Sequence, residues 1–256
     1  MKEIVIISGK GGTGKTSITS SLSMLEGVGA VVADCDVDAA DMHLLLQPDF
    51  ANGEDFYSGE IAAIDQDKCT KCGKCKKICR FDAIHLKDQT FTIDEIDCEG
   101  CGYCARICPT QAIKMSPALS GRSFISTTRT GNTLVHAELA IGADNSGKLV
   151  TKVKKTAKEI ALNQKLDYLI VDGTPGIGCP VTASLTGAHY SVIVTEPTVS
   201  GIHDMKRVYE LVQTFKIPVG VIINKYDLNL EKSREIESYI EGNKMDYLGK
   251  FNYNLN

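Results

Sequence analysis

A glycine-rich segment directly follows the first apolar run of the chain and limits how its N-terminal part can fold. The residues from Gly9 to Thr16 read Gly-Lys-Gly-Gly-Thr-Gly-Lys-Thr, which satisfies the pattern Gly-x-x-x-x-Gly-Lys-Ser/Thr. Between a strand and a helix, such glycines let successive backbone N–H groups converge on phosphate oxygens, and the helix N-terminus adds positive potential. We therefore expect Lys15 to reach the β- and γ-phosphates of a nucleotide and Thr16 to hold Mg²⁺. The predicted nucleotide-binding residues of this segment are Gly11, Gly12, Thr13, Gly14, Lys15, Thr16 and Ser17.

Most of the remaining chain alternates apolar strand candidates with helix candidates. Residues 168–171 and 219–223 are continuous apolar runs, as expected of parallel strands that are buried on both faces. Strands separated by helices imply right-handed crossovers. The pattern predicts an α/β fold with a doubly wound, mostly parallel sheet. The predicted strands are 30–34, 167–172, 190–195 and 217–223, and the predicted helices are 146–163, 180–187, 200–215 and 230–241.

Eight of the ten cysteines lie between Cys69 and Cys108 and form two copies of one pattern. Each copy reads Cys-x-x-Cys-x-x-Cys-x-x-x-Cys, the run of bacterial ferredoxins, and the copies are 29 positions apart (98 − 69). In two-cluster ferredoxins the fourth cysteine of each run ligates the other cluster. We therefore predict two [4Fe–4S] clusters, one held by Cys69, Cys72, Cys75 and Cys108, the other by Cys98, Cys101, Cys104 and Cys79. Zinc, which Cys-x-x-Cys pairs also bind, is the alternative.

The cysteine-rich stretch interrupts the α/β pattern and is expected to be an inserted α+β domain of the two-[4Fe–4S] ferredoxin type. The predicted boundaries are 1–60 and 117–256 for the two parts of the P-loop domain, and 61–116 for the insertion. Its two halves repeat, so we expect approximate two-fold symmetry and a small core that metal supplements. Arg80 departs from the pattern, because proline usually follows the fourth cysteine, as Pro109 does in the second run.

The two cysteine runs differ in charge. Glu95, Asp97 and Glu99 flank the second run, whereas the first is crowded by Lys68, Lys71, Lys74, Lys76, Lys77 and Arg80. A solvated surface would account for this difference. The sharper hypothesis is that the basic side docks an acidic redox partner, whose identity the sequence does not give.

Composition excludes several classes of protein. The 256 residues carry a formal net charge of −4, which argues against a general nucleic-acid-binding surface. No apolar run reaches the about 18 residues that cross a membrane, and the N-terminus reads as a strand rather than a signal peptide. We expect a cytoplasmic protein without disulfides and without membrane or nucleic-acid partners.

A second lysine, Lys10, lies inside the glycine-rich loop, and here the sequence resembles the deviant Walker A ATPases of the SIMIBI class. The resemblance implies a nucleotide-sandwich dimer in which Lys10 reaches the phosphates bound by the partner. It implies that Asp36 orients or activates the attacking water, that Asp34 assists near Mg²⁺, and that Asp172 is the Walker B residue and nucleotide switch. The implied catalytic residues are therefore Lys10, Lys15, Asp36 and Asp172. An aspartate at a strand end also serves as an ordinary helix cap.

Two further positions follow predicted strands. Asn224 begins the string Asn-Lys-Tyr-Asp after the strand at 217–223 and is expected to hold the purine. The string also resembles the guanine-reading motif of GTPases, so GTP remains an alternative to the ATP that the Walker resemblance favours.

Cys179 lies seven residues after Asp172, where the nitrogenase iron protein has a cluster-bridging cysteine. A packed small residue, a cluster ligand and a reactive thiol all remain open for Cys179.

Taken over nearly its whole length, the chain resembles MinD-superfamily P-loop ATPases with an inserted two-cluster ferredoxin domain. The resemblance implies a homodimer, or a heterodimer with a paralogue, in which ATP state is coupled to electron transfer through the clusters. An ATP-regulated carrier or scaffold for iron–sulfur clusters is the first alternative. A redox-sensing positioning ATPase of the cell-division or partition type is the second. The segment 248–253 departs from the group, whose members carry Gly-x-Ile-Pro-Tyr and a further helix there.

Overall fold

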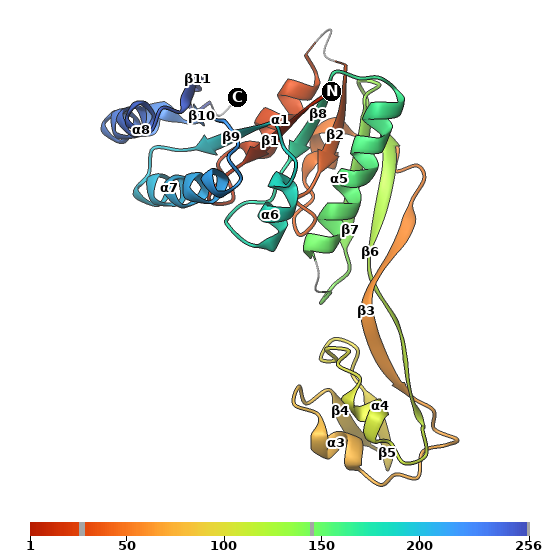
Figure 1. Ribbon diagram of the computed structural model, residues 1–256. Coiled ribbons are helices and arrows are strands. Elements are labelled where there is room, and N and C mark those ends of the chain that lie inside the picture. Colours follow the sequence, from red (N-terminus) through yellow and green to blue (C-terminus); the bar gives the residue numbers. More distant parts are fainter. Residues whose placement is uncertain (26–28, 144–145, 255–256) are drawn as a thin grey trace. The chain divides into compact units, whose positions relative to one another are not determined.

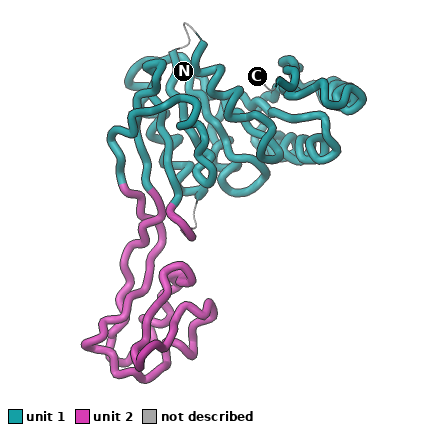
Figure 2. Tube along the Cα trace, turned by 180° about the vertical axis from the view of Figure 1, so that it is seen from behind, with its two compact units in different colours: residues 1–54, 122–139, 146–256 teal, residues 55–121, 140–145 magenta. Residues whose placement is uncertain are grey.

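The computed structural model describes residues 1–25, 29–143 and 146–254. Its contacts divide the chain into two compact units, which Figure 2 colours separately. The first unit comprises 1–54, 122–139 and 146–256, and the second comprises 55–121 and 140–145. The inserted domain that the sequence predicts at 61–116 lies within the second unit.

The first unit is built on a parallel sheet. Its strands follow the order β11-β10-β9-β1-β8-β2-β7, and β6 (Ile113–Thr127) and β3 (Glu54–Ile64) continue the hydrogen-bonded order beyond β7. The parallel strands are β1 (Lys2–Ile7), β2 (Ala30–Asp34), β7 (Thr133–Leu139), β8 (Tyr168–Asp172), β9 (Tyr190–Thr195), β10 (Val219–Ile223) and β11 (Asp246–Lys250). The predicted doubly wound α/β fold is confirmed.

Helices cover both faces of this sheet (Figure 1). One face packs against α1 (Lys15–Ser23) and α2 (Met42–Leu46), whose Ile18, Leu22, Met42 and Leu46 join clusters with buried strand residues such as Ile6 and Val32. The other helices of this unit are α5 (Ser146–Asn163), α6 (Cys179–Leu185), α7 (Val199–Thr214) and α8 (Leu230–Gly242), with the short 3-10 turn η1 (Tyr226–Leu228). Because both faces are covered, β2 and β10 are buried at every residue, and apart from Asp34 at the end of β2 both sequences are apolar.

The register of the parallel strands brings residues of the candidate site next to one another. Asp34 pairs with Asp172 across β2 and β8, and Ile6 of β1 pairs with Asp172 on its other side. The carboxyl ends of these strands therefore meet at the edge from which the glycine-rich loop leaves β1.

The second unit repeats one small motif. It contains α3 (Lys74–Ile78), α4 (Tyr103–Ile107) and the antiparallel pair β4 (Ile84–Lys87) and β5 (Thr90–Ile93). The Asp65 N–H donates to the Ala112 carbonyl at 2.7 Å, and the Asp94 N–H donates to the Ala83 carbonyl at 2.8 Å. These bonds join equivalent positions of the repeat in crossed fashion, as two-fold pseudosymmetry requires. Among the described residues of the chain, no helix is both long and apolar enough to span a membrane.

Candidate functional site

The glycine-rich loop places Lys15 at the start of α1. Gly14 caps the helix in the left-handed region, with φ of 90°, and a Cβ there would collide with the Asn224 side chain. Asn224 in turn donates from Nδ2 to the Thr13 carbonyl at 2.8 Å. The structure therefore brings Asn224, from the end of β10, against the loop that sequence reasoning assigned to phosphate.

Lys15 is buried and faces carboxylates. Its Nζ lies 2.9 Å from Asp172 Oδ2 and 3.4 Å from Asp36 Oδ2. Burial acts to lower the pKa of Lys15, but Asp172, Asp36 and Asp34 together outweigh burial and raise it. Three of the four residues that the resemblance marks as catalytic, Lys15, Asp36 and Asp172, thus lie together.

Asp172 organises the helix side of this cluster. It is fully buried, and its two carboxylate oxygens accept hydrogen bonds from Thr16 Oγ1 and Thr19 Oγ1, both at 2.7 Å. Burial and the neighbouring Asp172 carboxylate raise the pKa of Asp34 well above its usual range. Asp36 and Asp172 place two carboxylates against the one ammonium group of Lys15. Together with the Thr16 hydroxyl they form the hard oxygen donor set that Mg²⁺ prefers.

Lys10 is held within its own chain. Its Nζ lies 2.6 Å from Glu196 Oε1, and it donates to Ser200 Oγ at 3.1 Å and Thr198 Oγ1 at 3.4 Å. Glu196 Oε2 also lies 3.1 Å from Lys225 Nζ, which donates to the Gly12 carbonyl at 2.9 Å. Burial acts to raise the pKa of Glu196, but its bonds to Lys10 and Lys225 lower it.

Sequence reasoning missed Glu196 and Thr19. Glu196 directly follows β9, so its position at the carboxyl end of a parallel strand was the signal that could have found it. Thr19 lies one helical turn after Lys15, a spacing that places both side chains on one face of α1.

The Asn-Lys-Tyr-Asp string forms a second contact with the loop. Asn224 and Lys225 both donate to carbonyls of the glycine-rich loop, as described above. Asp227 is exposed, and its Oδ1 accepts the Tyr253 N–H at 2.6 Å. Asp227 thus holds the C-terminal segment at Tyr253.

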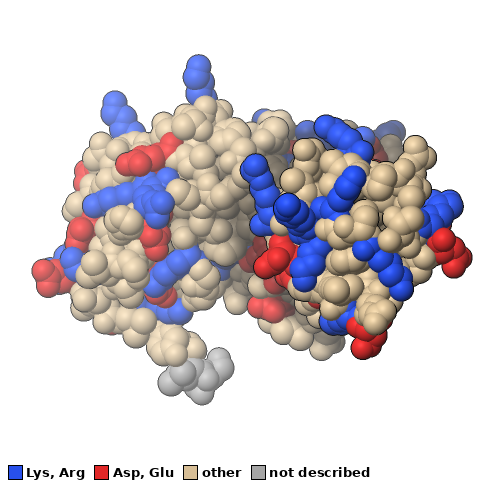
Figure 3. Space-filling model, turned by 90° about the horizontal axis from the view of Figure 1, so that it is seen from below, with Lys and Arg blue, Asp and Glu red and all other residues tan. Residues whose placement is uncertain are grey.

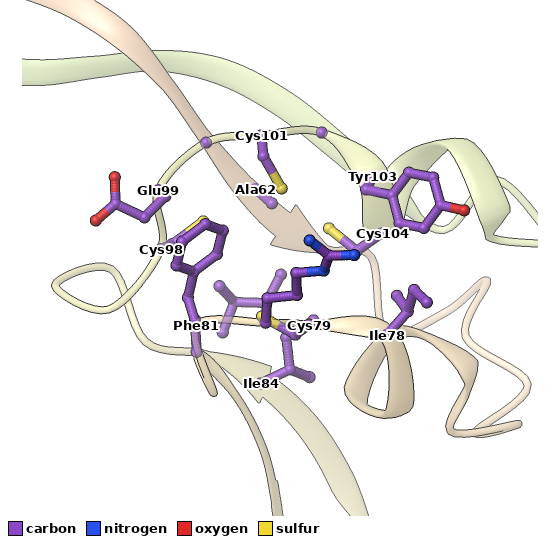
Figure 4. Close-up of a pocket in the computed structure, with 15 residues that line it drawn as sticks. Ala62, Ile78, Cys79, Phe81, Ile84, Cys98, Glu99, Cys101, Tyr103 and Cys104 are labelled. Carbon is purple, nitrogen blue, oxygen red and sulfur yellow. The ribbon is translucent and has the colours of Figure 1, made fainter.

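The eight cysteines of the insertion line two separate pockets. One pocket is lined by Cys69, Cys72, Cys75 and Cys108. The other is lined by Cys79, Cys98, Cys101 and Cys104, whose sulfur atoms turn toward one space beside Phe81 and Ile84 (Figure 4). Each pocket thus takes three cysteines from one run and the fourth from the other, the same grouping as the two predicted ligand sets. Four soft thiol ligands in an apolar enclosure fit a [4Fe–4S] cluster.

Backbone geometry supports both pockets. Gly73 and Gly102 precede α3 and α4 with φ of 72° and 69°, which lets the chain turn sharply between the second and third cysteines of each run. The Ala112 N–H donates to Cys108 Sγ at 3.3 Å. Burial acts to raise the pKa of Cys108, but this bond and its neighbours outweigh burial and lower it. N–H donors of this kind stabilise a coordinated thiolate.

The two other cysteines lie in the first unit. Cys35 is fully buried after β2, and burial raises the pKa of its thiol. Cys179 is exposed at the first position of α6, where Gly147 of α5 packs against it. Neither cysteine lines the two pockets described above.

In the comparisons with known proteins, a family model matches the cysteine-rich insertion, and two relatives match most of the chain. A family model described as a 4Fe-4S dicluster domain matches residues 62–115. The uncharacterized protein MJ0578 of Methanocaldococcus jannaschii is 37% identical over 229 residues, covering 89% of this chain and 79% of that protein. A second uncharacterized protein of the same organism, MJ0579, is 27% identical over 240 residues, covering 90% and 83%.

Among solved structures, the septum site-determining protein MinD complexed with Mg-ADP, from Pyrococcus horikoshii OT3, is similar in fold. The TM-score is 0.56 at 19% identity, and the match covers 99% of this chain and 82% of that chain. This likeness supports the α/β fold described above.

Proposed function

Since the chain belongs to the MinD-like P-loop ATPases that carry an inserted 4Fe-4S dicluster domain, we propose that it hydrolyses ATP and couples its nucleotide state to electron transfer through two [4Fe–4S] clusters. The observation that carries this proposal is the presence, in one chain, of a lysine–carboxylate site at a phosphate loop and two four-cysteine pockets.

The residues of the first unit have distinct roles in ATP hydrolysis. The backbone from Gly11 to Ser17 binds the phosphates, and Lys15 neutralises charge on the β- and γ-phosphates. Thr16 and Asp172, already joined at 2.7 Å, would hold Mg²⁺. Asp36 lies beside Lys15 with its carboxylate partly open to solvent, a position suited to orienting the attacking water.

Lys10 acts after dimerisation in this proposal. A cation supplied by a second chain stabilises charge that develops on the transferred phosphoryl group. To reach that position, Lys10 has to leave Glu196, Thr198 and Ser200, all of which are polar partners within its own chain. The second chain is an identical copy or a paralogue, and the two relatives in one organism make a paralogue available there.

The cysteines of the second unit hold the redox centres. Cys69, Cys72, Cys75 and Cys108 bind one cluster, and Cys79, Cys98, Cys101 and Cys104 bind the other. A [4Fe–4S] cluster supplies a one-electron redox centre when bound. Because each set draws on both runs, releasing a cluster would require ligands from both repeats to let go. This arrangement favours retention and electron transfer over delivery of clusters to other proteins.

The test is an anaerobic preparation analysed for iron and sulfide and by EPR, with and without MgATP. We expect about eight irons per chain, two clusters of four, and a change in the EPR spectrum of the reduced protein when MgATP is added. The coupling would be contradicted if the protein held its full complement of iron but its EPR spectra and midpoint potentials did not change when MgATP was added.

A further inference from the structure

A surface groove of about 630 Å³ lies within the second unit, beside the first cysteine of the second run. We call it the Cys98 groove, and its lining includes Tyr57, Ile96, Leu119 and Ile141. These four large apolar side chains are 55%, 70%, 52% and 97% exposed. These apolar side chains lie among polar groups, which make up the larger part of the exposed groove lining.

The groove walls are fixed by close packing within the unit. Gly100 has φ of 60°, and a Cβ there would collide with the Glu60 carbonyl, so the loop after Cys98 lies directly on β3. The Ala140 N–H donates to the Ser120 carbonyl at 3.0 Å, which holds the segment 140–143 against β6. A preformed groove loses little conformational freedom when a partner binds.

The groove leads to a cysteine that the proposed function assigns to a cluster. Cys98 is half-buried and lines both the groove and the four-cysteine pocket behind it. Glu99 also lines both spaces. A protein seated in the groove would therefore contact the outer side of a ligand sulfur, and short separations of this kind favour electron exchange.

Charge distinguishes this groove from the equivalent region of the other repeat. The segment 94–100 carries four carboxylates and no basic side chain, whereas the equivalent segment 65–71 carries two carboxylates and two lysines. Glu60, Glu95 and Glu99 are exposed around the groove. By contrast, the first run carries the exposed lysines Lys71, Lys74, Lys76 and Lys77. Arg80, which directly follows that run, lines the pocket of Cys98. Figure 3 shows lysine and arginine side chains over much of the visible surface, with acidic side chains among them.

We propose that the Cys98 groove docks a basic redox protein, one whose lysine or arginine side chains pair with Glu60, Glu95 and Glu99 and whose apolar side chains contact Ile96. This inference rests on the proposed electron-transfer function. Mixed polar and apolar contacts together with complementary charge are typical of transient protein interfaces. The step exchanges one electron between the partner's redox centre and the site held by Cys79, Cys98, Cys101 and Cys104, and no bond forms or breaks.

The test uses the full-length, cluster-loaded protein and mitochondrial cytochrome c, a lysine-rich haem protein, as the basic probe. Binding is measured by calorimetry with both proteins oxidised, and electron transfer by stopped-flow with the cluster protein reduced. We expect the double variant Glu95→Lys/Glu99→Lys to weaken binding about tenfold and to flatten its salt dependence. Ile96→Ser should weaken binding several-fold without changing the salt dependence, because it removes apolar contact alone.

The matched control is Lys74→Glu/Lys76→Glu, which reverses charge at the other pocket. It should leave cytochrome c affinity unchanged or slightly higher. Equal weakening by both double variants, or none by Glu95→Lys/Glu99→Lys, overturns the proposal. A photo-crosslinker placed at Ile96 should react with the cytochrome. Crosslinks to a second copy of this chain, or to its own first unit, would assign the groove to that occupant and overturn the proposal.

Failure of the proposed function is distinguishable from failure of this one. MgATP-dependent EPR changes report on coupling and do not involve the groove. If those changes are absent while the groove variants behave as expected, the docking site stands without nucleotide coupling. If the EPR changes are present while Glu95→Lys/Glu99→Lys binds cytochrome c as tightly as the wild type does, the groove assignment is wrong.

Discussion

Lys10 is a residue whose contacts in one chain differ from its expected place in a dimer. It ion-pairs with Glu196 at 2.6 Å, whereas Lys15 ion-pairs with Asp172 inside the phosphate site. We expect Lys10→Ala to leave ATP affinity within a few-fold and to slow hydrolysis about 10³-fold, as loss of a trans-acting cation does. Lys15→Ala is the matched control and should abolish nucleotide binding. Fluorescent-nucleotide titration and phosphate release measure the two effects, and normal hydrolysis by Lys10→Ala would show that the trans assignment is wrong.

The crossed cysteine sets also make a prediction for single residues. Two double variants each remove two cysteines, but they differ in how those residues are distributed. Cys69→Ser/Cys108→Ser removes two ligands from one pocket and should leave about four irons per chain. Cys69→Ser/Cys79→Ser removes one ligand from each pocket, although both residues lie in one run, and should disturb both clusters. Iron analysis and EPR distinguish the outcomes, and the reverse result would mean that each run binds its own cluster.

At the scale of elements, the loop after β10 bears on which base is bound. Asp227 Oδ1 accepts the Tyr253 N–H, so the carboxylate already has a partner within the chain. If it serves as an anchor, Asp227→Asn should leave ATP affinity within about twofold, because an amide oxygen still accepts that bond. If it reads guanine, wild type should bind GTP more tightly than ATP, and Asp227→Asn should lose GTP selectively. Competition titrations with both nucleotides decide, and we expect the first result.

Continuous apolar runs made most sheet strands predictable. The strands at 30–34 and 190–195 and the helix at 146–163 have the same bounds in sequence and structure. By contrast, β7 contains His136, which interrupts its apolar pattern yet is buried against Ser126 at 3.0 Å. Pro117 and Gly121 likewise hide the long strand β6. Pattern reading fails where a polar side chain is buried with a hydrogen-bond partner on the neighbouring strand, or where proline and glycine lie inside a long strand.

The candidate site was likewise predictable from the sequence only in part. The meeting of Lys15, Asp36 and Asp172 follows from the rule that carboxyl ends of parallel strands share one edge. The pairing of Lys10 with Glu196 could not be read from the sequence, because it depends on how α7 approaches the loop and on which of several carboxylates a long side chain selects. Spacing fixes which residues lie near one another, while side-chain packing decides which of them touch.

For the whole molecule, coupling means that nucleotide binding and cluster reduction change each other's free energy by the same amount. If MgATP shifts the midpoint potential of the clusters, reduction must change ATP affinity by the same free energy. For a one-electron centre, a shift of about 59 mV corresponds to a tenfold change in the dissociation constant. We expect ATP affinity and hydrolysis to differ between oxidised and dithionite-reduced protein, with the affinity ratio equal to that derived from redox titrations with and without MgATP. Cys69→Ser/Cys79→Ser is the control for effects of dithionite itself, because its nucleotide site is intact and both cysteine pockets are broken. Identical ATP affinities in both redox states, together with identical potentials, would leave an ATPase and a ferredoxin that are joined by the chain and independent in function.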